Sequence, residues 1–475
     1  MSKTPSDATT DRDRTAVVLS DRPLPEKVDV LVLGSGSAGS KVATTCAEDG
    51  QTVAVIENRD FGGTCALRGC NPKKVLVRAA ELVDYARTMR GKYLQEDDSV
   101  RLDWQAVQRY QDSFTEPIEP GKIESLRKAG VHIVRGQPHL ENSHTAIVGD
   151  HQITFDRLVI ATGGKPITPP FEGGELPLTS DDFLELESLP KSVIFLGGGY
   201  ISSEFAHVAH IAGCEVTLIE RGEHLLEGFD PDLVRMLEAT SRSRGMTIYT
   251  LAEVESVARE GDSYRVTFET ETGTKTIAAE MVVQGLGRGP AIDTLNLEAA
   301  GVEREKTGVS VDEQCRSVSQ SHVWAIGDCA AHGHPMLTPT ANETARCVAR
   351  QLTGDADAQV DISPVPLAAF TIPPLGSVGM LEPEARETYG DDLTIKHESM
   401  AEWTTFRKVG AEAAAYKTLV QTSTGKIVGA HLLGPEAPEL INLFAMAVKF
   451  GLTRHQMKSV LFTYPTLASE IRAMV

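Results

Sequence analysis

The sequence predicts an α/β protein that contains two βαβ units, followed by an α+β module. The first observation is a β-branched apolar run, residues 28–33, that leads directly into a glycine loop at 34–39. The second is the same order of elements over residues 192–202. The third is a change of character after about residue 355, where prolines separate strand-like pieces. Because buried parallel strands form continuous apolar runs, the first two observations indicate parallel sheets.

The first unit has the features of a Rossmann-like dinucleotide-binding domain. A helix is expected over residues 38–50 and a strand over 52–57. Glycines in such a loop allow a tight turn, close approach of the backbone to a pyrophosphate, and close packing of helix on strand. The pyrophosphate then meets the N-terminus of the helix. Glu57 ends the second strand, where a carboxylate can accept hydrogen bonds from ribose hydroxyls. The alternative is a glycine-rich turn without a ligand.

The second unit repeats this order less regularly. A strand over 192–196 is followed by Gly197, Gly198 and Gly199, but Ser202 stands where a third glycine is usual. A helix through Ile211 and a strand over 215–220 complete the unit. Glu220 at the end of that strand favours a free 2′-hydroxyl, and therefore NADH over NADPH. Arg221 beside it offers the opposite contact, to a 2′-phosphate. Two more strand-to-loop endings are predicted at 158–163 and 323–328.

The C-terminal module contains no phosphate loop. A hairpin is predicted from strands at 418–420 and 426–430, which flank the turn residues 423–425. Helices are expected over about 439–451 and 454–461.

Two cysteines, Cys65 and Cys70, lie in the glycine-rich segment 62–74. A metal site requires more ligands at short spacing, and no second Cys or His cluster accompanies the pair. Two buried reduced cysteines remain an alternative. The third interpretation is a redox disulfide, because the local glycines and Pro72 allow an irregular helix start that brings the cysteines together. Lys73 and Lys74 are expected to raise the local potential and favour the thiolate.

Composition limits the classes of partner. At 475 residues, two to four domains are expected. The net charge of −20 argues against nucleic acid or an anionic membrane as a partner. No apolar run approaches the roughly 20 residues that span a bilayer. Residues 1–26 are polar and are predicted to form a flexible tail. Seven scattered cysteines without a secretion signal indicate a reducing, cytoplasmic location.

These motifs together resemble the flavoprotein pyridine nucleotide-disulfide oxidoreductases, which include glutathione reductase, dihydrolipoamide dehydrogenase and mercuric reductase. The resemblance covers roughly residues 27–475 and rests on segments 62–74, 161–163 and 326–328. It implies FAD at the first loop and NADH or NADPH at the second. It also implies an FAD domain over 27–180 and 308–355, an NAD(P) domain over 181–307, and a dimerisation domain over 360–475.

The resemblance also implies roles for individual residues. Tyr200 swings aside so that NAD(P)H reaches the flavin, while Lys73 or Lys74 pairs with Glu204. Cys70 then receives the electrons and Cys65 attacks a disulfide substrate by thiol-disulfide exchange. The implied cofactor-binding residues are Gly34, Gly36, Ser37, Gly39, Glu57, Gly63, Thr64, Lys74, Gly136, Thr162, Gly163, Asp328, Leu337, Thr338, Gly197, Gly199, Tyr200, Ile201, Glu220, Arg221 and Gly287. No resident metal is implied.

The sequence departs from the family near residue 464. Disulfide-reducing members carry a histidine there, supplied by the partner subunit, and a nearby glutamate that orients it. Here Tyr464 takes the histidine position and Glu470 arrives one residue late. A phenol with a reference pKa of about 10 is a poor base at neutral pH, although it can donate a proton.

The expected activity is therefore reduction of a small disulfide by an NAD(P)H-dependent flavoenzyme (EC 1.8.1 type), in a homodimer whose active site is shared between subunits. The alternative is a mercuric reductase-like enzyme, or a reductase of another electrophile or a quinone. A non-catalytic flavoprotein scaffold ranks third.

Overall fold

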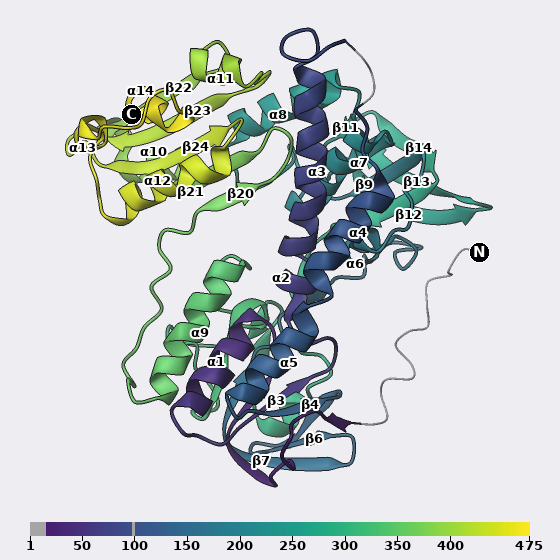
Figure 1. The fold of residues 1–475 in the computed structure, drawn as a ribbon, viewed down its shortest axis with the longest axis vertical. Helices are drawn as coiled ribbons and strands as arrows, with labels where there is room; N and C mark the ends of the chain where they lie inside the picture. Colours follow the sequence, from purple (N-terminus) through teal and green to yellow (C-terminus); the bar gives the residue numbers. More distant parts are fainter. Residues whose placement is uncertain (1–15, 97–99) are drawn as a thin grey trace. The chain divides into compact units, whose positions relative to one another are not determined.

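A computed structural model describes residues 16–96 and 100–475 (Figure 1). The chain forms two compact units. The first comprises the described residues up to Pro72, together with Gln111–Ile167 and Arg288–Ile362. The second comprises Lys73–Tyr110, Thr168–Gly287 and Ser363–Val475.

The main sheet of the first unit has the strand order β1-β4-β3-β2-β7-β6-β5, and β19 pairs with β7. Strands β4, β3, β2, β7 and β19 are parallel, whereas β1 and the β5–β6 hairpin are antiparallel to their neighbours. The bounds are β1 (Val17–Val18), β2 (Lys27–Leu33), β3 (Val53–Glu57), β4 (His132–Arg135), β5 (Pro138–Asn142), β6 (Thr145–Val148), β7 (His151–Ile160) and β19 (Val323–Ala325).

The first predicted βαβ unit is present, with shifted ends. The apolar run 28–33 forms β2, and residues 30–33 are fully buried. Helix α1 (Ser37–Glu48) ends before Gly50, which adopts a positive φ of 89°. In Figure 1, α1 lies beside α9 (Thr338–Leu352). The other helices of this unit are α2 (Gly63–Leu67), α5 (Ile118–Lys128), η1 (Leu297–Ala300) and η2 (Gly327–Cys329).

The structure differs from the prediction at several boundaries. Residues 73–110 and 168–180, predicted for the FAD domain, belong to the second unit, and so does the C-terminal module. Val17 and Val18 pair with β4 as β1, so the polar segment 1–26 is not wholly a tail; residues 1–15 lie outside the described residues. The predicted boundary at residue 307 also differs. Strand β16 (Arg288–Pro290) pairs with β8 (Gly164–Pro166), which places residues 288–307 in the first unit. A short ladder of β17 (Arg304–Glu305) and β18 (Gly308–Val309) follows.

The second unit contains the second βαβ unit, in a parallel sheet of order β11-β10-β9-β15. Strand β9, helix α7 and strand β10 match the predicted order, although β10 ends one residue before Glu220. An antiparallel sheet, β12-β13-β14, is inserted before β15. The bounds are α6 (Ser180–Leu184), β9 (Ser192–Leu196), α7 (Tyr200–Ala212), β10 (Glu215–Ile219), α8 (Pro231–Ser243), β11 (Thr247–Tyr249), β12 (Glu253–Glu260), β13 (Ser263–Thr270), β14 (Gly273–Ala279) and β15 (Met281–Gln284).

The C-terminal part of the second unit is an antiparallel sheet of order β20-β21-β24-β23-β22. Helix α12 covers β21 and β24 (Figure 1) and buries Ile441 and Phe444. The predicted hairpin is β23–β24. The bounds are β20 (Leu367–Ala369), β21 (Leu375–Gly379), α10 (Glu382–Tyr389), η3 (Gly390–Asp392), β22 (Leu393–Ser399), α11 (Thr404–Lys408), β23 (Ala415–Gln421), β24 (Ile427–Leu433), α12 (Ala437–Lys449), α13 (Arg454–Ser459), η4 (Leu467–Glu470) and α14 (Ile471–Met474).

The chain passes from the first unit to the second within α3 (Cys70–Thr88) and returns to the first within α4 (Trp104–Thr115). Within residues 16–96 and 100–475, no helix combines the length and apolarity needed to cross a bilayer.

Candidate active site

Three loops meet at the carboxyl edge of the first unit's sheet. The last residues of β2, β7 and β19 are in register: Leu33 pairs with Ile160, which also pairs with Ala325. The loops that follow these strands are 34–36, 161–163 and 326–328. Because ligands of open α/β sheets bind outside the carboxyl ends of the strands, this edge is the candidate cofactor site. The edge brings the predicted residues Thr162, Gly163 and Asp328 to the first glycine loop.

The glycine loop leaves no room for side chains. A Cβ on Gly34, whose φ is +105°, would lie 2.3 Å from the carbonyl oxygen of Ala161. A Cβ on Gly39 would lie 2.1 Å from the carbonyl oxygen of Gly34. Gly36 is the N-cap of α1 and makes no side-chain capping bond, and Ser37 is the first helical residue. The tight loop and the N-terminus of a twelve-residue helix fit the pyrophosphate of a dinucleotide.

We expect Gly39→Ala to abolish FAD retention, because the added methyl group displaces the backbone at Gly34. The ratio of flavin to protein absorbance after gel filtration checks this. Gly121→Ala is the matched control: Gly121 lies in α5, and nothing lies within 4 Å of its Cβ position. Its flavin content should equal that of the wild type. A Gly39→Ala enzyme with full flavin content would contradict the cradle.

Glu57 is turned toward the glycine loop. One carboxylate oxygen accepts hydrogen bonds from the backbone N–H and the hydroxyl of Ser35, both at 2.8 Å. The other accepts from the N–H of Arg59 at 3.0 Å. Gly136, which follows β4, donates its N–H to the carbonyl oxygen of Glu57 at 2.9 Å. Glu57, the residue predicted to bind the ribose, is therefore fixed beside the N-terminus of α1.

Asp328 lies in η2 at the same edge. Burial raises the pKa of the Asp328 carboxyl, and the Arg288 guanidinium opposes that shift. Arg288 also donates a hydrogen bond to the carbonyl oxygen of Gly164 at 2.5 Å. Leu337 and Thr338, both predicted to line the flavin site, are the N-cap and first residue of α9.

The cysteine pair spans a break between two helices. Cys65 lies in α2 and Cys70 is the first residue of α3; both are free thiols in this structure. Sγ of Cys70 lies 3.9 Å from Oγ1 of Thr338. A Cβ on Gly63, at φ +74°, would lie 2.5 Å from Cα of Gly36, so the segment with Gly63 and Thr64 packs directly on the first glycine loop. The predicted irregular helix start is confirmed.

The expected effect of the lysines on the thiols is wrong. A hydrogen bond with Cys70 and then burial raise the pKa of the Cys65 thiol, and contact with Thr338 only partly opposes this. Lys73 and Lys74 instead face Glu204, on α7. Their Nζ atoms lie 2.7 and 2.6 Å from one carboxylate oxygen. Burial acts to raise the pKa of Glu204, but the two lysines outweigh it and hold the pKa below its usual value.

The second glycine loop follows β9. A Cβ on Gly197, at φ +89°, would lie 2.9 Å from the carbonyl oxygen of Gly285. Gly199 caps α7, which begins with Tyr200 and Ile201. The absent third glycine has a local reason: the Ser202 hydroxyl is buried and donates to the carbonyl oxygen of Leu196 at 3.2 Å. Gly287 is the last residue of the segment Thr168–Gly287 of the second unit and directly precedes β16.

Glu220 is held at the second loop in the way that Glu57 is held at the first. Its carboxylate accepts hydrogen bonds from the N–H of Gly198 and from the N–H of Gly222, the latter at 2.6 Å. Arg221 is exposed beside it.

Tyr464 and Glu470 are not brought together. The Tyr464 side chain is 78% exposed. Glu470 accepts a hydrogen bond from the hydroxyl of Thr405 at 2.8 Å. The family-derived pairing of an acid-base residue with this glutamate is therefore not seen in the single chain.

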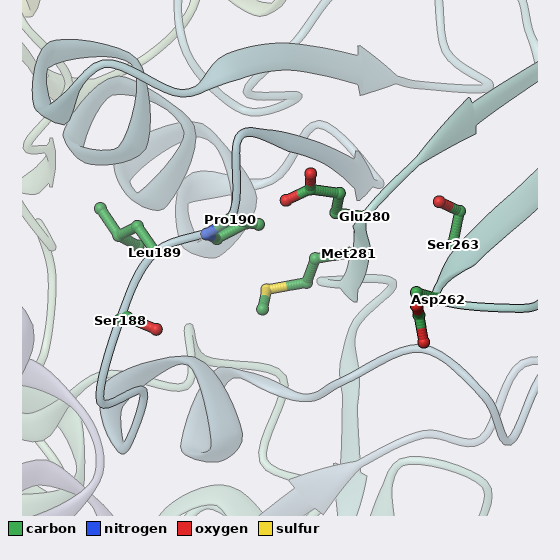
Figure 2. A pocket seen from close by; sticks show the side chains of 7 residues that line it. All are labelled: Ser188, Leu189, Pro190, Asp262, Ser263, Glu280 and Met281. Atoms are coloured by element: carbon green, nitrogen blue, oxygen red, sulfur yellow. The ribbon is translucent and has the colours of Figure 1, made fainter. Parts of the chain in front are cut away.

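A pocket of about 440 Å³ lies elsewhere in the second unit (Figure 2). It is lined by Ser188, Leu189, Pro190, Asp262, Ser263, Glu280 and Met281. Strand β15 begins at Met281 and β9 begins just beyond Pro190, so the pocket lies at the amino ends of these parallel strands. The glycine loop follows their carboxyl ends. The pocket is therefore not the nucleotide site.

Asp230, Asp232 and Glu382 have the spacing of a metal site. However, Nζ of Lys417 lies within 2.9 Å of all of them, and its side chain is 2% exposed. A protein cation therefore fills the centre of this cluster.

The sequence analysis does not identify Ser35, Arg288, Thr405 or Phe370, the last of which donates its backbone N–H to Glu204 at 3.0 Å. Ser35 lies inside the glycine motif at residues 34–39, so its position in the motif could have identified it. The other residues act through contacts distant in sequence, for which the chain offers no local pattern.

The comparisons with known proteins agree with this geometry. The pattern of the pyridine nucleotide-disulphide oxidoreductases matches residues 28–345, and that of their dimerisation domain matches 365–475. A glutathione reductase from Nostoc sp. is 31% identical over 463 residues, which is 94% of this chain and 99% of that protein. A dihydrolipoyl dehydrogenase from Haloferax volcanii is 30% identical, covering 93% and 94%. A mercuric reductase from Staphylococcus aureus is 29% identical, covering 94% and 81%.

A solved structure shows the same fold over nearly the whole chain. It is the Cu(II) complex of a mutant of RclA, the HOCl-induced flavoprotein disulfide reductase of Escherichia coli. The TM-score is 0.85 at 27% identity, covering 95% of this chain and 99% of that one. Members of the matched family bind FAD and a pyridine nucleotide. This chain belongs to the pyridine nucleotide-disulphide oxidoreductase family and is an FAD-dependent NAD(P)H disulfide oxidoreductase.

Proposed function

We propose that the enzyme uses NADH to reduce a small disulfide through Cys65 and Cys70, as a glutathione reductase-like enzyme. The observation that carries this proposal is the packing of the cysteine segment on the first glycine loop, with Gly63 against Gly36. A second contact supports the proposal: Oγ1 of Thr338, predicted to lie near the flavin, is 3.9 Å from Sγ of Cys70.

The residues divide into two sets. The first unit holds FAD through its glycine loop, Glu57 and Asp328. The second unit holds NADH through Gly197–Gly199 and Glu220. FAD, when bound, supplies hydride acceptance from NADH and delivery of two electrons to a disulfide. The chain's own task is to place the thiols and to move protons.

The thiol chemistry balances over one turnover. Two electrons and two protons convert the Cys65–Cys70 disulfide into two thiols. Cys65, as the thiolate, attacks the substrate disulfide, forms a mixed disulfide and releases one substrate thiol. Cys70 then attacks the Cys65 sulfur, releases the second substrate thiol and restores the protein disulfide. NADH and a proton are consumed, and two substrate thiols are formed.

The substrate sulfur that leaves in each exchange step takes up a proton. We propose that Tyr464 of a second subunit faces the thiols in a homodimer and donates a proton to the leaving thiolate. Leu461, three residues before Tyr464, supports this because its apolar side chain is 90% exposed in the single chain. A monomer that sediments as such and is fully active would overturn the dimer.

The coenzyme preference depends on Glu220. We expect kcat/KM for NADH to exceed that for NADPH by at least about tenfold, since a 2′-phosphate meets a carboxylate. Glu220→Ala should reduce this ratio, and Glu223→Ala serves as the control on the same exposed loop. Steady-state kinetics with both coenzymes measure the ratio. A preference of the wild type for NADPH would contradict the role of Glu220.

A thiophilic metal ion such as Hg²⁺ is the second candidate acceptor. Tyr464 in the histidine position favours it, and a mercuric reductase is among the similar proteins. A panel on the NADH-reduced enzyme separates the two: glutathione disulfide, lipoamide, Hg²⁺ and a quinone, with wild type and Tyr464→His. Disulfide turnover that rises in Tyr464→His supports the disulfide assignment. Turnover of Hg²⁺ alone would replace it.

We further propose a cytoplasmic location, where thiols stay reduced. Five of the seven cysteines are buried free thiols. Cell fractionation with thiol labelling tests this, and a fully oxidised, secreted protein would contradict it.

A further inference from the structure

Glu204 is held at both carboxylate oxygens, by different parts of the chain. One oxygen receives Lys73 and Lys74, which lie on α3. The other accepts the backbone N–H of Phe370 at 3.0 Å. Phe370 directly follows β20, in the C-terminal segment. Because the carboxylate is only 1% exposed, an oxygen without a donor there would carry a desolvation cost, and the N–H of Phe370 removes that cost.

The same residue also contacts one of the lysines. The ammonium of Lys74 lies 3.7 Å from the centroid of the Phe370 ring. The ammonium of Lys73 lies 5.2 Å from the Tyr200 ring and 5.7 Å from the Phe205 ring. Each ammonium therefore has a carboxylate oxygen and an aromatic face. A cation is attracted to an aromatic face, and more strongly where water is excluded.

We expect the contact of Lys73 with Tyr200 to be lost during turnover and the contact of Lys74 with Phe370 to persist. Tyr200 begins α7 directly after the glycine loop and is 40% exposed. Under the proposed function it moves when NADH binds, and Lys73 then loses one ring. Lys74 keeps Phe370, which is partly buried and tied to Glu204 by its backbone. Two like charges on one carboxylate oxygen repel each other, and the Phe370 ring gives Lys74 an attractive contact that opposes this repulsion.

We infer that Phe370 is a positioning residue: its ring and N–H together keep Lys74 on Glu204 while coenzyme binds. The cluster of two lysines and one glutamate then carries a net positive charge throughout hydride delivery. This inference deepens the proposed function and rests on it for the movement of Tyr200. The contacts of Phe370 do not depend on it.

The direct test is the reactivity of Lys74 toward acetic anhydride, followed by peptide mass spectrometry in the full-length enzyme without added coenzyme. Phe370→Leu removes the ring but keeps the N–H and most of the volume. We expect Lys74 to be acetylated about fivefold faster in this variant, with Phe370→Tyr close to wild type. Phe171→Leu is the matched control, because Phe171 is also partly buried but packs on a separate apolar cluster. Equal Lys74 rates in Phe370→Leu and Phe171→Leu would overturn the inference.

A second readout separates positioning from coenzyme binding. In stopped-flow reduction by NADH, Phe370→Leu should slow the limiting rate and leave the half-saturating NADH concentration unchanged. A change confined to half-saturation would count against positioning. If NADH does not reduce the wild-type flavin, the proposed function fails, whereas the acetylation result still decides whether Phe370 holds Lys74.

Discussion

Cys65→Ser is expected to lower turnover of a small disulfide by at least about 1,000-fold, while NADH still reduces the bound flavin. A hydroxyl cannot form the mixed disulfide, so transfer to the substrate stops. The reaction before that point does not use the Cys65 sulfur as a nucleophile. Stopped-flow absorbance follows flavin reduction, and steady-state NADH consumption follows turnover of glutathione disulfide.

Cys214→Ser is the matched control for this prediction. The Cys214 thiol donates a hydrogen bond to the carbonyl oxygen of Pro190 at 3.1 Å, and a serine hydroxyl can do the same. We expect wild-type turnover in this variant. Disulfide turnover that survives in Cys65→Ser, with the control also active, would remove Cys65 from the reaction.

The raised pKa of Cys65 adds a pH dependence. In the dithiol, the hydrogen bond with Cys70 and burial both favour the neutral thiol. The fraction of thiolate at pH 7 is therefore lower than for an ordinary cysteine, and it increases as pH rises. Alkylation of Cys65 by iodoacetamide in the reduced enzyme should accelerate steadily from pH 7 to pH 10.

The features predictable from sequence are those that neighbouring residues determine. Strand β2, the glycine loop and Glu57 lie within a few tens of residues, and each constrains the others through one βαβ unit. The edge shared by loops 34–36, 161–163 and 326–328 was also predictable in outline, because each strand ends in its own loop. Shared position at the carboxyl edge then follows from parallel pairing.

The features that could not be predicted depend on contacts between distant residues. Composition marked the segment 1–26 as polar, yet the partner of Val17 and Val18 is β4, more than a hundred residues away. The predicted effect of Lys73 and Lys74 on the thiols is wrong because closeness in sequence does not show which group a charged side chain faces. Both ammonium groups point to Glu204, because its carboxylate forms an ion pair with each of them.

Lys417 illustrates the same limit, because nothing near it in sequence marks it as a buried cation. Its partners are Asp230, which caps α8 through the N–H groups of Asp232 and Leu233, together with Asp232 and Glu382 themselves. Burial acts to lower the pKa of Lys417, but these carboxylates outweigh it and raise the pKa above its usual value. The ammonium therefore stays charged, and it joins β23 to α8 and α10.

Lys417→Met is expected to destabilise this region by about 3–5 kcal/mol at pH 7.5, because removing the ammonium leaves the buried carboxylate of Asp230 without its cation. Hydrogen exchange at the amides of β23 measures the free energy of opening directly. Lys165→Met is the control. Its partner Asp293 lies 2.6 Å away, but both side chains are more than half exposed. We expect a change within about 1 kcal/mol there.

The dependence on pH should reverse sign in Lys417→Met. In the wild type, Lys417 holds the pKa values of Asp232 and Glu382 below their usual range. Their stabilising contribution is present above the unfolded pKa values of about 4 and is lost as pH falls through the folded values. Without the ammonium, Arg235 and Arg386 still face Asp232 and Glu382. The carboxylate of Asp230, which is fully buried, loses the ammonium that neutralises it, so protonation of the cluster favours the folded state. Between pH 7.5 and pH 5, protection of β23 should therefore increase in Lys417→Met, whereas in the wild type it should stay level or decrease. Parallel pH profiles in the two proteins would show that Lys417 does not neutralise this cluster.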